Sequence, residues 1–479
     1  MTPLCPTSPL SIDSISLCVK RAEYAVRGTL AIRAEEIRSE LASGKDLNFD
    51  KVINSNIGNP QALDQKPLTF FRQVIALTEY PSLLSDSNLP LTRQLFPSDA
   101  ISRAKVLLEE IGSTGVYTTS QGILSVRKHV AKYISERDGH PSHSDDIFLT
   151  SGASAGIQTI LQLLLSGPRD GILIPIPQYP LYSAALSLLN GTPIPYHLEE
   201  VSNWSTSLHS IKTALEKTKS EGTVVKGLVV INPGNPTGSV LSDFQISQLL
   251  KLCESEKILI LADEVYQTNV FHSPFVSFKK VLRDENRKVQ LVSFHTISKG
   301  MIGECGKRGG YMELCNIPPD VREQIYKLAS IGLCPPVSGQ IIVDLMVNPP
   351  KKGDESFEIY DKEYRFIYET LKDRAKMLEN AFRQMAGVEC QGAQGAMYLF
   401  PRMNFPSRFI ETAKKLNKPP DEVYCMDLLN STGICIVPGS GFGQEEGTYH
   451  VRTTFLAPGK ELIDRWIEFH RNFMENYGD

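Results

Sequence analysis

The sequence lacks the features that mark several large classes of protein. No apolar run approaches the roughly 18 to 20 residues that cross a bilayer, and the strongest runs, at 227–231 and 258–262, have the length of a strand. Fifty basic residues stand against 54 acidic ones, so no excess charge of one sign attracts nucleic acid or an acidic membrane. We therefore expect small-molecule partners, and neither nucleic acid nor a membrane.

Cysteine spacing and the N-terminal residues exclude further classes. The nine cysteines are scattered and odd in number, and none forms a CxxC pair, so we predict neither a disulfide framework nor a metal site. The first 17 residues contain no Lys or Arg and no long apolar core, unlike a secretory signal or an Arg-rich mitochondrial presequence. The sequence therefore predicts a cytoplasmic protein.

What the sequence does contain is typical of a large globular α/β protein. Its 479 residues are 41% apolar and 22% charged, enough for an extensive core in two or three domains. Short β-rich runs alternate with helical stretches between about 100 and 345. This alternation predicts a mostly parallel, doubly wound sheet with helices on both faces. The five β-rich runs are 146–152, 171–180, 225–233, 257–266 and 289–299.

The two ends of the chain are expected to build a smaller α+β domain. Residues 19–43 have a helical pattern that stops at Gly44, and a Pro/Lys/Gly-rich stretch at 348–356 reads as a linker before a long helix over 358–386. Short strands and a last helix near 459–476 follow. The predicted divisions are an N-terminal arm (1–45), the N-terminal part of the small domain with its connection (46–100), the large domain (101–347) and the C-terminal small domain (348–479).

Polar groups follow four of the predicted strands, where ligands of open α/β sheets bind. Ser151 to Gly156 lead into an apolar helix and would hold an anion on free backbone N–H groups; alternatively Ser154 simply caps that helix. Asn235 lies in the segment NPGNPTG, where its side chain could face a ligand; alternatively, this segment is only a turn. Asp263 ends an apolar run, and Tyr266 follows three residues later. An acid at such a position binds a cationic ligand or a metal, or caps a helix.

The fifth strand is followed by Ser298 and Lys299, and then by Arg308. A lysine leaving an apolar strand can become an amine nucleophile, although a solvated loop lysine is the simpler interpretation. One ligand satisfies all of these groups together. Pyridoxal phosphate has an aldehyde for Lys299, a ring nitrogen for Asp263, a phenolic oxygen for Asn235 and Tyr266, and a phosphate for Ser154, Ser298 and Arg308.

Two other patterns point elsewhere, and we interpret both as structural. Gly439 to Gly443 follow an apolar run, but Gln444 stands where a dinucleotide fingerprint needs glycine. His295 and Cys305 flank Lys299 without a third group to orient them as a nucleophile pair, so packing roles are expected.

The motifs resemble those of the fold type I pyridoxal-phosphate enzymes, and in particular the class I and II aminotransferases. Within that family, several segments are most similar to the alanine aminotransferases, and together they span nearly the whole chain. These segments are 19–37, 56–74, 179–186, 232–238, 261–267, 293–316 and 450–456.

The resemblance implies a role for each site residue. Lys299 would bond the cofactor aldehyde, Asp263 would pair with the ring nitrogen, and Asn235 and Tyr266 would donate to the ring oxygen. Tyr179 would stack on the ring. The phosphate would be held by Ala153, Ser154, Ser298 and Arg308, and by Tyr117 of the neighbouring subunit of a homodimer. Arg452 would bind the substrate carboxylate, with Gly58 and Asn235 beside it.

The implied reaction converts L-alanine and 2-oxoglutarate to pyruvate and L-glutamate in two half-reactions with ping-pong kinetics. Two alternatives remain open. The chain could transaminate another amino acid (glutamate with glyoxylate, aromatic amino acids or 2-aminoadipate), or act as a lyase on the same cofactor. A non-catalytic regulator on this fold is disfavoured, because residues 1–50 have no basic helix-turn-helix pattern.

Overall fold

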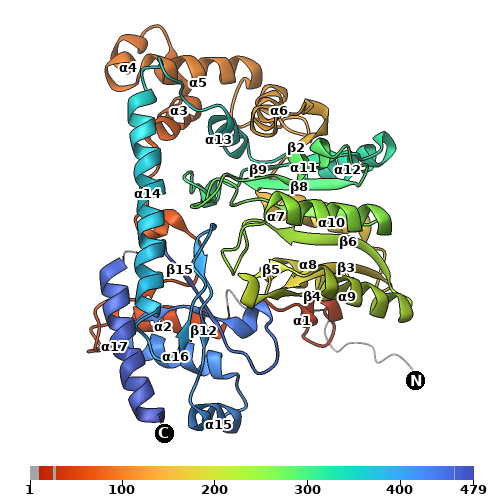
Figure 1. Cartoon of the computed structure of the whole chain (residues 1–479). Coiled ribbons are helices and arrows are strands. Elements are labelled where there is room, and N and C mark those ends of the chain that lie inside the picture. The colour runs from red at the N-terminus through yellow and green to blue at the C-terminus, as the bar shows by residue number, and fades with distance from the viewer. Residues whose placement is uncertain (1–9, 25–27, 458, 479) are drawn as a thin grey trace.

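A central eight-stranded sheet organises the computed structural model, which describes residues 10–24, 28–457 and 459–478. Its strand order is β2-β9-β8-β7-β6-β3-β4-β5 (Figure 1). The bounds are β2 Ile147–Thr150, β3 Asp170–Ile176, β4 Thr192–Glu199, β5 Ser205–Thr206, β6 Val224–Ile231, β7 Leu259–Asp263, β8 Leu291–Thr296 and β9 Gly310–Cys315.

Strands β8, β7, β6, β3 and β4 are mutually parallel, whereas β9 pairs antiparallel with both β2 and β8. Side chains alternate between two cores: Leu228 and Val230 of β6 join one buried cluster and Val229 joins the other. A strand buried on both faces needs helices on both sides of the sheet. The predicted doubly wound fold class is therefore confirmed.

The helices around this sheet belong to two groups. One core cluster takes side chains from α9, α10 and α11, and the other takes them from α6, α7, α8 and α13. The bounds are α6 Leu124–Asp138, α7 Ala153–Leu164, α8 Leu181–Leu188, α9 Leu208–Ser220, α10 Asp243–Glu256, α11 Phe278–Asp284, α12 Pro319–Ile331 and α13 Val337–Val347. Helix α3, Thr69–Glu79, packs against α13 and against α5, Ser98–Ile111, and the short helix α4, Leu89–Leu95, precedes α5.

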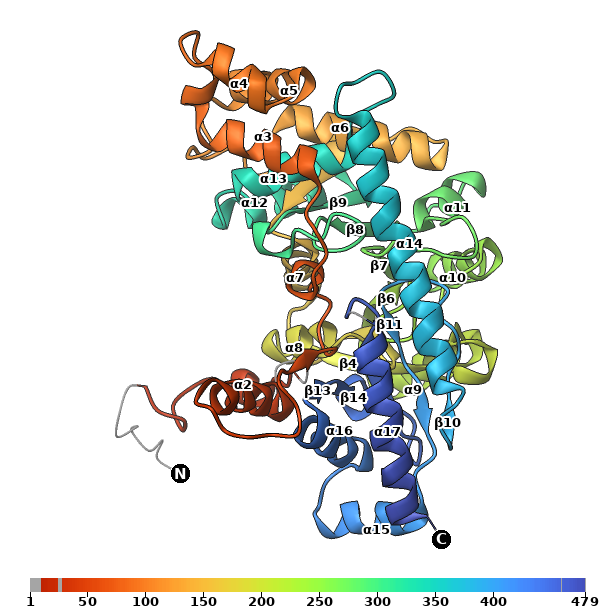
Figure 2. The same cartoon turned by 90° about the vertical axis from the view of Figure 1, so that its left-hand side faces the viewer.

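Segments from both chain ends lie together at the end of the molecule that is farthest from α3, α4 and α5 (Figure 2). Strand β1 pairs in parallel with β13, and β11-β15-β14 form a three-stranded sheet. The bounds are α2 Thr29–Ala42, β1 Ile53–Asn54, β10 Val388–Glu389, β11 Tyr398–Leu399, β12 Arg402–Met403, α15 Ser407–Lys415, α16 Pro420–Thr432, β13 Ile434–Cys435, β14 Val437–Pro438, β15 Val451–Thr454 and α17 Gly459–Tyr477. The four domain boundaries themselves stay a prediction.

Helix α14, Phe357–Phe382, joins the two parts and runs along the side of the molecule from α4 and α5 to α17 (Figure 1). It begins one residue before the predicted start and ends four residues before the predicted end. Its buried face includes Ile367, Leu371, Ala375, Leu378 and Phe382, which are spaced three or four residues apart. This apolar stripe is what made the helix predictable.

The N-terminal helical pattern is divided in the structure. Helix α1, Leu17–Arg21, ends with an extended Ala22, and α2 begins at Thr29 after Gly28. Val26, which the continuous pattern included, lies outside the described residues. The expected single helix over 19–43 is therefore wrong, because Gly28 is extended and interrupts it.

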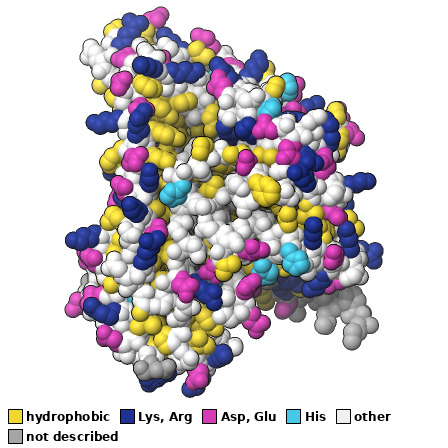
Figure 3. Space-filling view, viewed as in Figure 1, with side chains coloured by type: hydrophobic (Ala, Val, Ile, Leu, Met, Phe, Trp, Pro, Cys, Tyr) yellow, Lys and Arg dark blue, Asp and Glu magenta, His cyan; other side chains and the backbone are white. Residues whose placement is uncertain are grey.

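The surface carries mixed charge. On the face shown in Figure 3, Lys and Arg side chains are interspersed with Asp and Glu rather than separated from them. Within the described ranges, no helix is both long and apolar enough to cross a membrane.

Candidate active site

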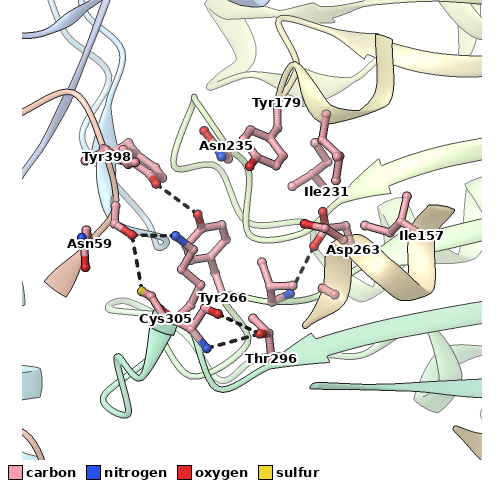
Figure 4. A pocket seen from close by; sticks show the side chains of 18 of the residues that line it. Asn59, Ile157, Tyr179, Ile231, Asn235, Asp263, Tyr266, Thr296, Cys305 and Tyr398 are labelled. Carbon is pink, nitrogen blue, oxygen red and sulfur yellow. Dashed lines mark hydrogen bonds between the residues drawn. The ribbon is translucent and has the colours of Figure 1, made fainter. Parts of the chain in front are cut away.

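A cavity of about 410 Å³ lies at the carboxyl ends of β6, β7 and β8 (Figure 4). The last residues of these strands, Ile231, Asp263 and Thr296, line it together with the start of α7. Of the predicted site residues, all but Tyr117 open into this cavity. They are Gly58, Ala153, Ser154, Tyr179, Asn235, Asp263, Tyr266, Ser298, Lys299, Arg308 and Arg452.

Lys299 lies on the turn after β8 and is only partly exposed. Its Nζ donates to the carbonyl oxygen of Gly58 at 2.8 Å and lies 5.9 Å from the centroid of the Tyr266 ring. A single backbone acceptor and an aromatic face hold the amine in the cavity. The simpler interpretation, a lysine extended into solvent, is therefore wrong.

Asp263 is buried at the end of β7, with 4% of its surface exposed. Burial raises the pKa of its carboxyl group to about 6, against the hydrogen bond from the Tyr182 hydroxyl at 2.8 Å and the charge of Lys299. A cationic partner beside a buried carboxylate stabilises its ionised form and offsets the cost of burial. A protonated ring nitrogen in the cavity would supply that charge.

The start of α7 forms a cradle for an anion. Gly152 occupies the N-cap with φ +85° and makes no side-chain cap, so the alternative in which Ser154 caps the helix is wrong. Arg308 reaches the same place: Nη2 donates to the Ser151 carbonyl oxygen at 3.0 Å and Nη1 to the Ser298 hydroxyl at 3.3 Å. Helix N–H groups, hydroxyls and a guanidinium converge as a phosphate requires.

Substituting Gly152 tests this cradle. A Cβ there would lie 2.3 Å from Arg308 Nη2, so we expect Gly152→Ala to displace the guanidinium and weaken cofactor binding by about tenfold or more. Gly139→Ala is the matched control, because Gly139 also has positive φ, +73°, but open space around it. Both variants lose about 1 kcal/mol through backbone strain. Fluorescence titration with pyridoxal phosphate separates them; equal affinities would contradict the cradle.

Arg452 enters the cavity from β15 and is 1% exposed. Its Nη1 donates to Asn235 Oδ1 at 3.1 Å, and its Nη2 donates to the carbonyl oxygen of Asn56. The rings of Tyr398 and Phe442 lie against the guanidinium, at 4.3 and 4.6 Å from the ring centroids. Its buried Nε has no hydrogen-bond partner in the part of the chain that the structure describes. A carboxylate would neutralise this charge.

Three tyrosines that the sequence did not single out contribute to the site. Tyr398 lines the cavity from β11, and Tyr182 of α8 bonds Asp263. Tyr24 also lines the cavity, and its hydroxyl lies 2.7 Å from that of Tyr179.

Tyr117 is 77% exposed and lies outside the cavity. Cys305, assigned to packing, is a lining residue whose Sγ donates to the Ser298 carbonyl oxygen at 3.1 Å.

A cluster of buried charge lies next to Asp263 in the sequence. The Glu264 carboxylate accepts a hydrogen bond from the backbone N–H of Phe278 at 2.8 Å. Burial raises the pKa of Glu264 to about 8, although the charge of Arg137 acts in the opposite direction. Arg137 Nη1 donates a hydrogen bond to Gln267 Oε1 at 2.6 Å, and Arg137 Nη2 forms an ion pair with Asp138 Oδ2 at 2.7 Å.

This shifted pKa makes stability depend on pH. Between pH 4.5, the ordinary pKa, and about 8, the folded state holds a proton on Glu264 that the unfolded state releases. The free energy of unfolding therefore falls as pH rises through this window, by up to about 1.4 kcal/mol per pH unit. Glu264→Gln keeps the acceptor and removes the titration. Urea unfolding at pH 5 to 8 should show that this slope is reduced in the variant; equal slopes would contradict the buried acid.

The fold and the cavity together define a class. An open α/β sheet whose strand ends present a lysine, a buried carboxylate and an anion cradle fits the fold type I enzymes that bind pyridoxal phosphate. The chain belongs to the aminotransferase class I and II family, whose model matches residues 82–468. The cofactor of this family is pyridoxal 5′-phosphate.

Relatives match along nearly the whole length. The mitochondrial alanine aminotransferase of Saccharomyces cerevisiae is 50% identical, over 99% of this chain and 82% of its own. Glutamate–glyoxylate aminotransferase 2 of Arabidopsis thaliana is 48% identical, over 98% of both chains. A second S. cerevisiae relative, also 48% identical over 98% of this chain and 96% of its own, is named an inactive alanine aminotransferase.

A solved structure agrees on the fold. An alanine aminotransferase from Pyrococcus furiosus superposes with a TM-score of 0.76 at 24% identity, covering 96% of this chain and all of the other.

The cytoplasmic location expected from the N-terminal residues is wrong, because similar relatives, the 50% identical yeast alanine aminotransferase among them, are mitochondrial. The lack of basic residues in the first 17 positions was not a sufficient argument for the cytoplasm.

Proposed function

We propose that the protein is an alanine aminotransferase that exchanges the amino group between L-alanine and 2-oxoglutarate, giving pyruvate and L-glutamate. One observation carries the proposal: an amine, Lys299, and a buried guanidinium, Arg452, open into the same cavity beside Asp263. The named relatives support the choice of alanine as substrate.

The residues of the cavity would hold pyridoxal phosphate in a defined orientation. The cradle of Ala153, Ser154, Ser298 and Arg308 would bind its phosphate, and Asp263 would keep a proton on the ring nitrogen. Asn235 and Tyr266 would donate to the ring oxygen, and Tyr179 would pack against the ring. When bound, the cofactor withdraws electrons from the substrate Cα and carries the amino group between the two substrates.

The chain supplies binding and proton transfer. Arg452 would bind the carboxylate that all four substrates share, in the bidentate geometry that guanidinium favours. Lys299 would take the proton from the substrate Cα and deliver a proton to the cofactor carbon that receives the amino group, as a positioned amine can. Because Arg452 is buried, water does not screen its attraction for the carboxylate.

A product assay tests the proposal. Cofactor-loaded protein is incubated with L-alanine and 2-oxoglutarate, and pyruvate and glutamate are measured over time; equal amounts of the two products are expected. Glyoxylate replaces 2-oxoglutarate in a parallel assay, because two glutamate–glyoxylate aminotransferases are 48% identical to this chain. If glyoxylate with glutamate gives the higher kcat/KM, that activity replaces the proposal. If neither pair reacts, the chain is inactive.

We further propose a homodimer with shared active sites. Tyr117 is too exposed to serve its own cavity, and in a dimer its hydroxyl would reach the phosphate of the partner's cofactor. Light scattering should then give twice the mass of one chain. A monomer that is fully active would contradict this arrangement.

A further inference from the structure

Tyr398 is placed beside Arg452 by the pairing of two strands. Residue Tyr398 of β11 is opposite Thr454 of β15, and Arg452 lies two residues before Thr454 on the same face. This register brings the Tyr398 ring against the guanidinium of Arg452. The distance from Arg452 Cζ to the ring centroid is 4.3 Å. Tyr398 is 2% exposed, so its hydroxyl needs polar partners inside the protein.

The hydroxyl of Tyr398 extends past Arg452 to the reacting end of the cavity. The Tyr266 hydroxyl lies 3.3 Å away and donates to it, as the dashed line in Figure 4 shows. A Cβ built on Gly58 would lie 2.2 Å from the Tyr398 oxygen and 3.0 Å from Lys299 Nζ, so the hydroxyl and the amine flank Gly58. The phenol therefore lies between the predicted carboxylate site and the catalytic lysine.

The hydrogen-bonding capacity of this hydroxyl is only half used. In this structure its oxygen accepts from Tyr266. When Tyr266 gives its single proton to the cofactor's ring oxygen instead, the Tyr398 hydroxyl still has its own proton to donate. Burial by itself raises the pKa of the Tyr398 phenol, but the charges of Lys299 and Arg452, with the bond from Tyr266, bring the pKa below its ordinary value. A more acidic phenol is a stronger donor to an anion.

We propose that Tyr398 binds the substrate carboxylate directly, as a hydrogen-bond donor beside Arg452 and Gly58. This inference rests on the proposed function, because it takes the ligand of Arg452 to be an amino or keto acid. A carboxylate held between Arg452 and the Gly58 backbone would lie beside the Tyr398 hydroxyl, on the side of the cavity that faces Lys299. The same contact serves alanine, pyruvate, glutamate and 2-oxoglutarate, because it reads only the group they share.

Tyr398→Phe tests this role, since it removes one oxygen and keeps the ring that packs on Arg452. The probe is propionate, which has the carboxylate and carbon chain of alanine but no amino group and cannot react. Calorimetry on the cofactor-loaded protein should show propionate binding weakened about tenfold to a hundredfold, the range for a hydrogen bond to a charged group. The KM values for L-alanine and 2-oxoglutarate should rise together, with kcat changed by less than about threefold.

Tyr368→Phe is the matched control. Tyr368 lies on α14 outside the cavity, and its hydroxyl donates to the Val270 carbonyl oxygen at 2.8 Å, so the same oxygen is lost without touching the site. Cofactor content and Tm confirm that both variants are folded. Unchanged propionate affinity in Tyr398→Phe would overturn the inference. If the unmodified protein binds no propionate, the carboxylate site, and with it the proposed function, fails first.

Discussion

We expect Lys299→Ala to bind pyridoxal phosphate without a covalent bond and to turn over at least about 10⁴-fold more slowly than the unmodified protein. The expectation follows from the position of Nζ, which lines the cavity and is held by the Gly58 carbonyl at 2.8 Å. Removing this amine removes both the group that would attach the cofactor and the group that would move the Cα proton. Borohydride reduction followed by mass spectrometry should label Lys299 in the unmodified protein alone.

Lys307→Ala is the control for this experiment. Lys307 belongs to the same segment after β8, but it is not among the residues that line the cavity. We expect it to keep its covalent cofactor and most of its activity. Near-normal turnover in Lys299→Ala, or loss of equal size in both variants, would contradict the assignment of Lys299.

Asp263→Asn should lower turnover by about 10²- to 10⁴-fold while the protein stays folded. An amide is similar in size to the carboxyl group and still accepts a hydrogen bond from Tyr182, but it cannot hold a proton on the ring nitrogen by charge. Without that proton, the ring withdraws electrons from the substrate less strongly. Stopped-flow measurement of the alanine half-reaction reports this loss directly.

Glu264→Gln provides a matched comparison for Asp263→Asn. The two acids are neighbours and both are buried, but the Glu264 carboxylate accepts from the Phe278 backbone N–H and does not line the cavity. We expect its half-reaction to stay within about threefold of the unmodified rate. If the two variants lose the same activity, the effect comes from disturbing β7 and not from the ring nitrogen.

Much of the fold was predictable, because parallel strands buried on both faces leave a clear pattern. The runs that became β2, β3, β6, β7 and β8 are continuous apolar segments, and the rule that ligands bind at their carboxyl ends located the cavity. Asp263 and Lys299 were visible because each is a charged residue at, or within three residues of, the end of an apolar strand. Their chemistry was therefore readable before their contacts were known.

The remaining contributors could not be predicted, because they depend on contacts between distant segments. Tyr398 lies in an aromatic-rich run that predicts only a strand, and its position against Arg452 follows from the pairing of β11 with β15. Tyr182 reaches Asp263 across 81 positions of the sequence. Its spacing of three residues from Tyr179, which lies just before α8, was the single available signal. The division between α1 and α2 was missed because apolar periodicity continues through Gly28.

The absorption spectrum of the cofactor-loaded protein, recorded before and after addition of L-alanine alone, shows whether the protein takes the amino group from alanine. We expect the band of the lysine-bound cofactor to bleach with alanine and to return when 2-oxoglutarate is added. A band that alanine leaves unchanged while another amino acid bleaches it would contradict the alanine assignment and keep the site. A protein that shows no band after reconstitution with pyridoxal phosphate would contradict the catalytic account itself.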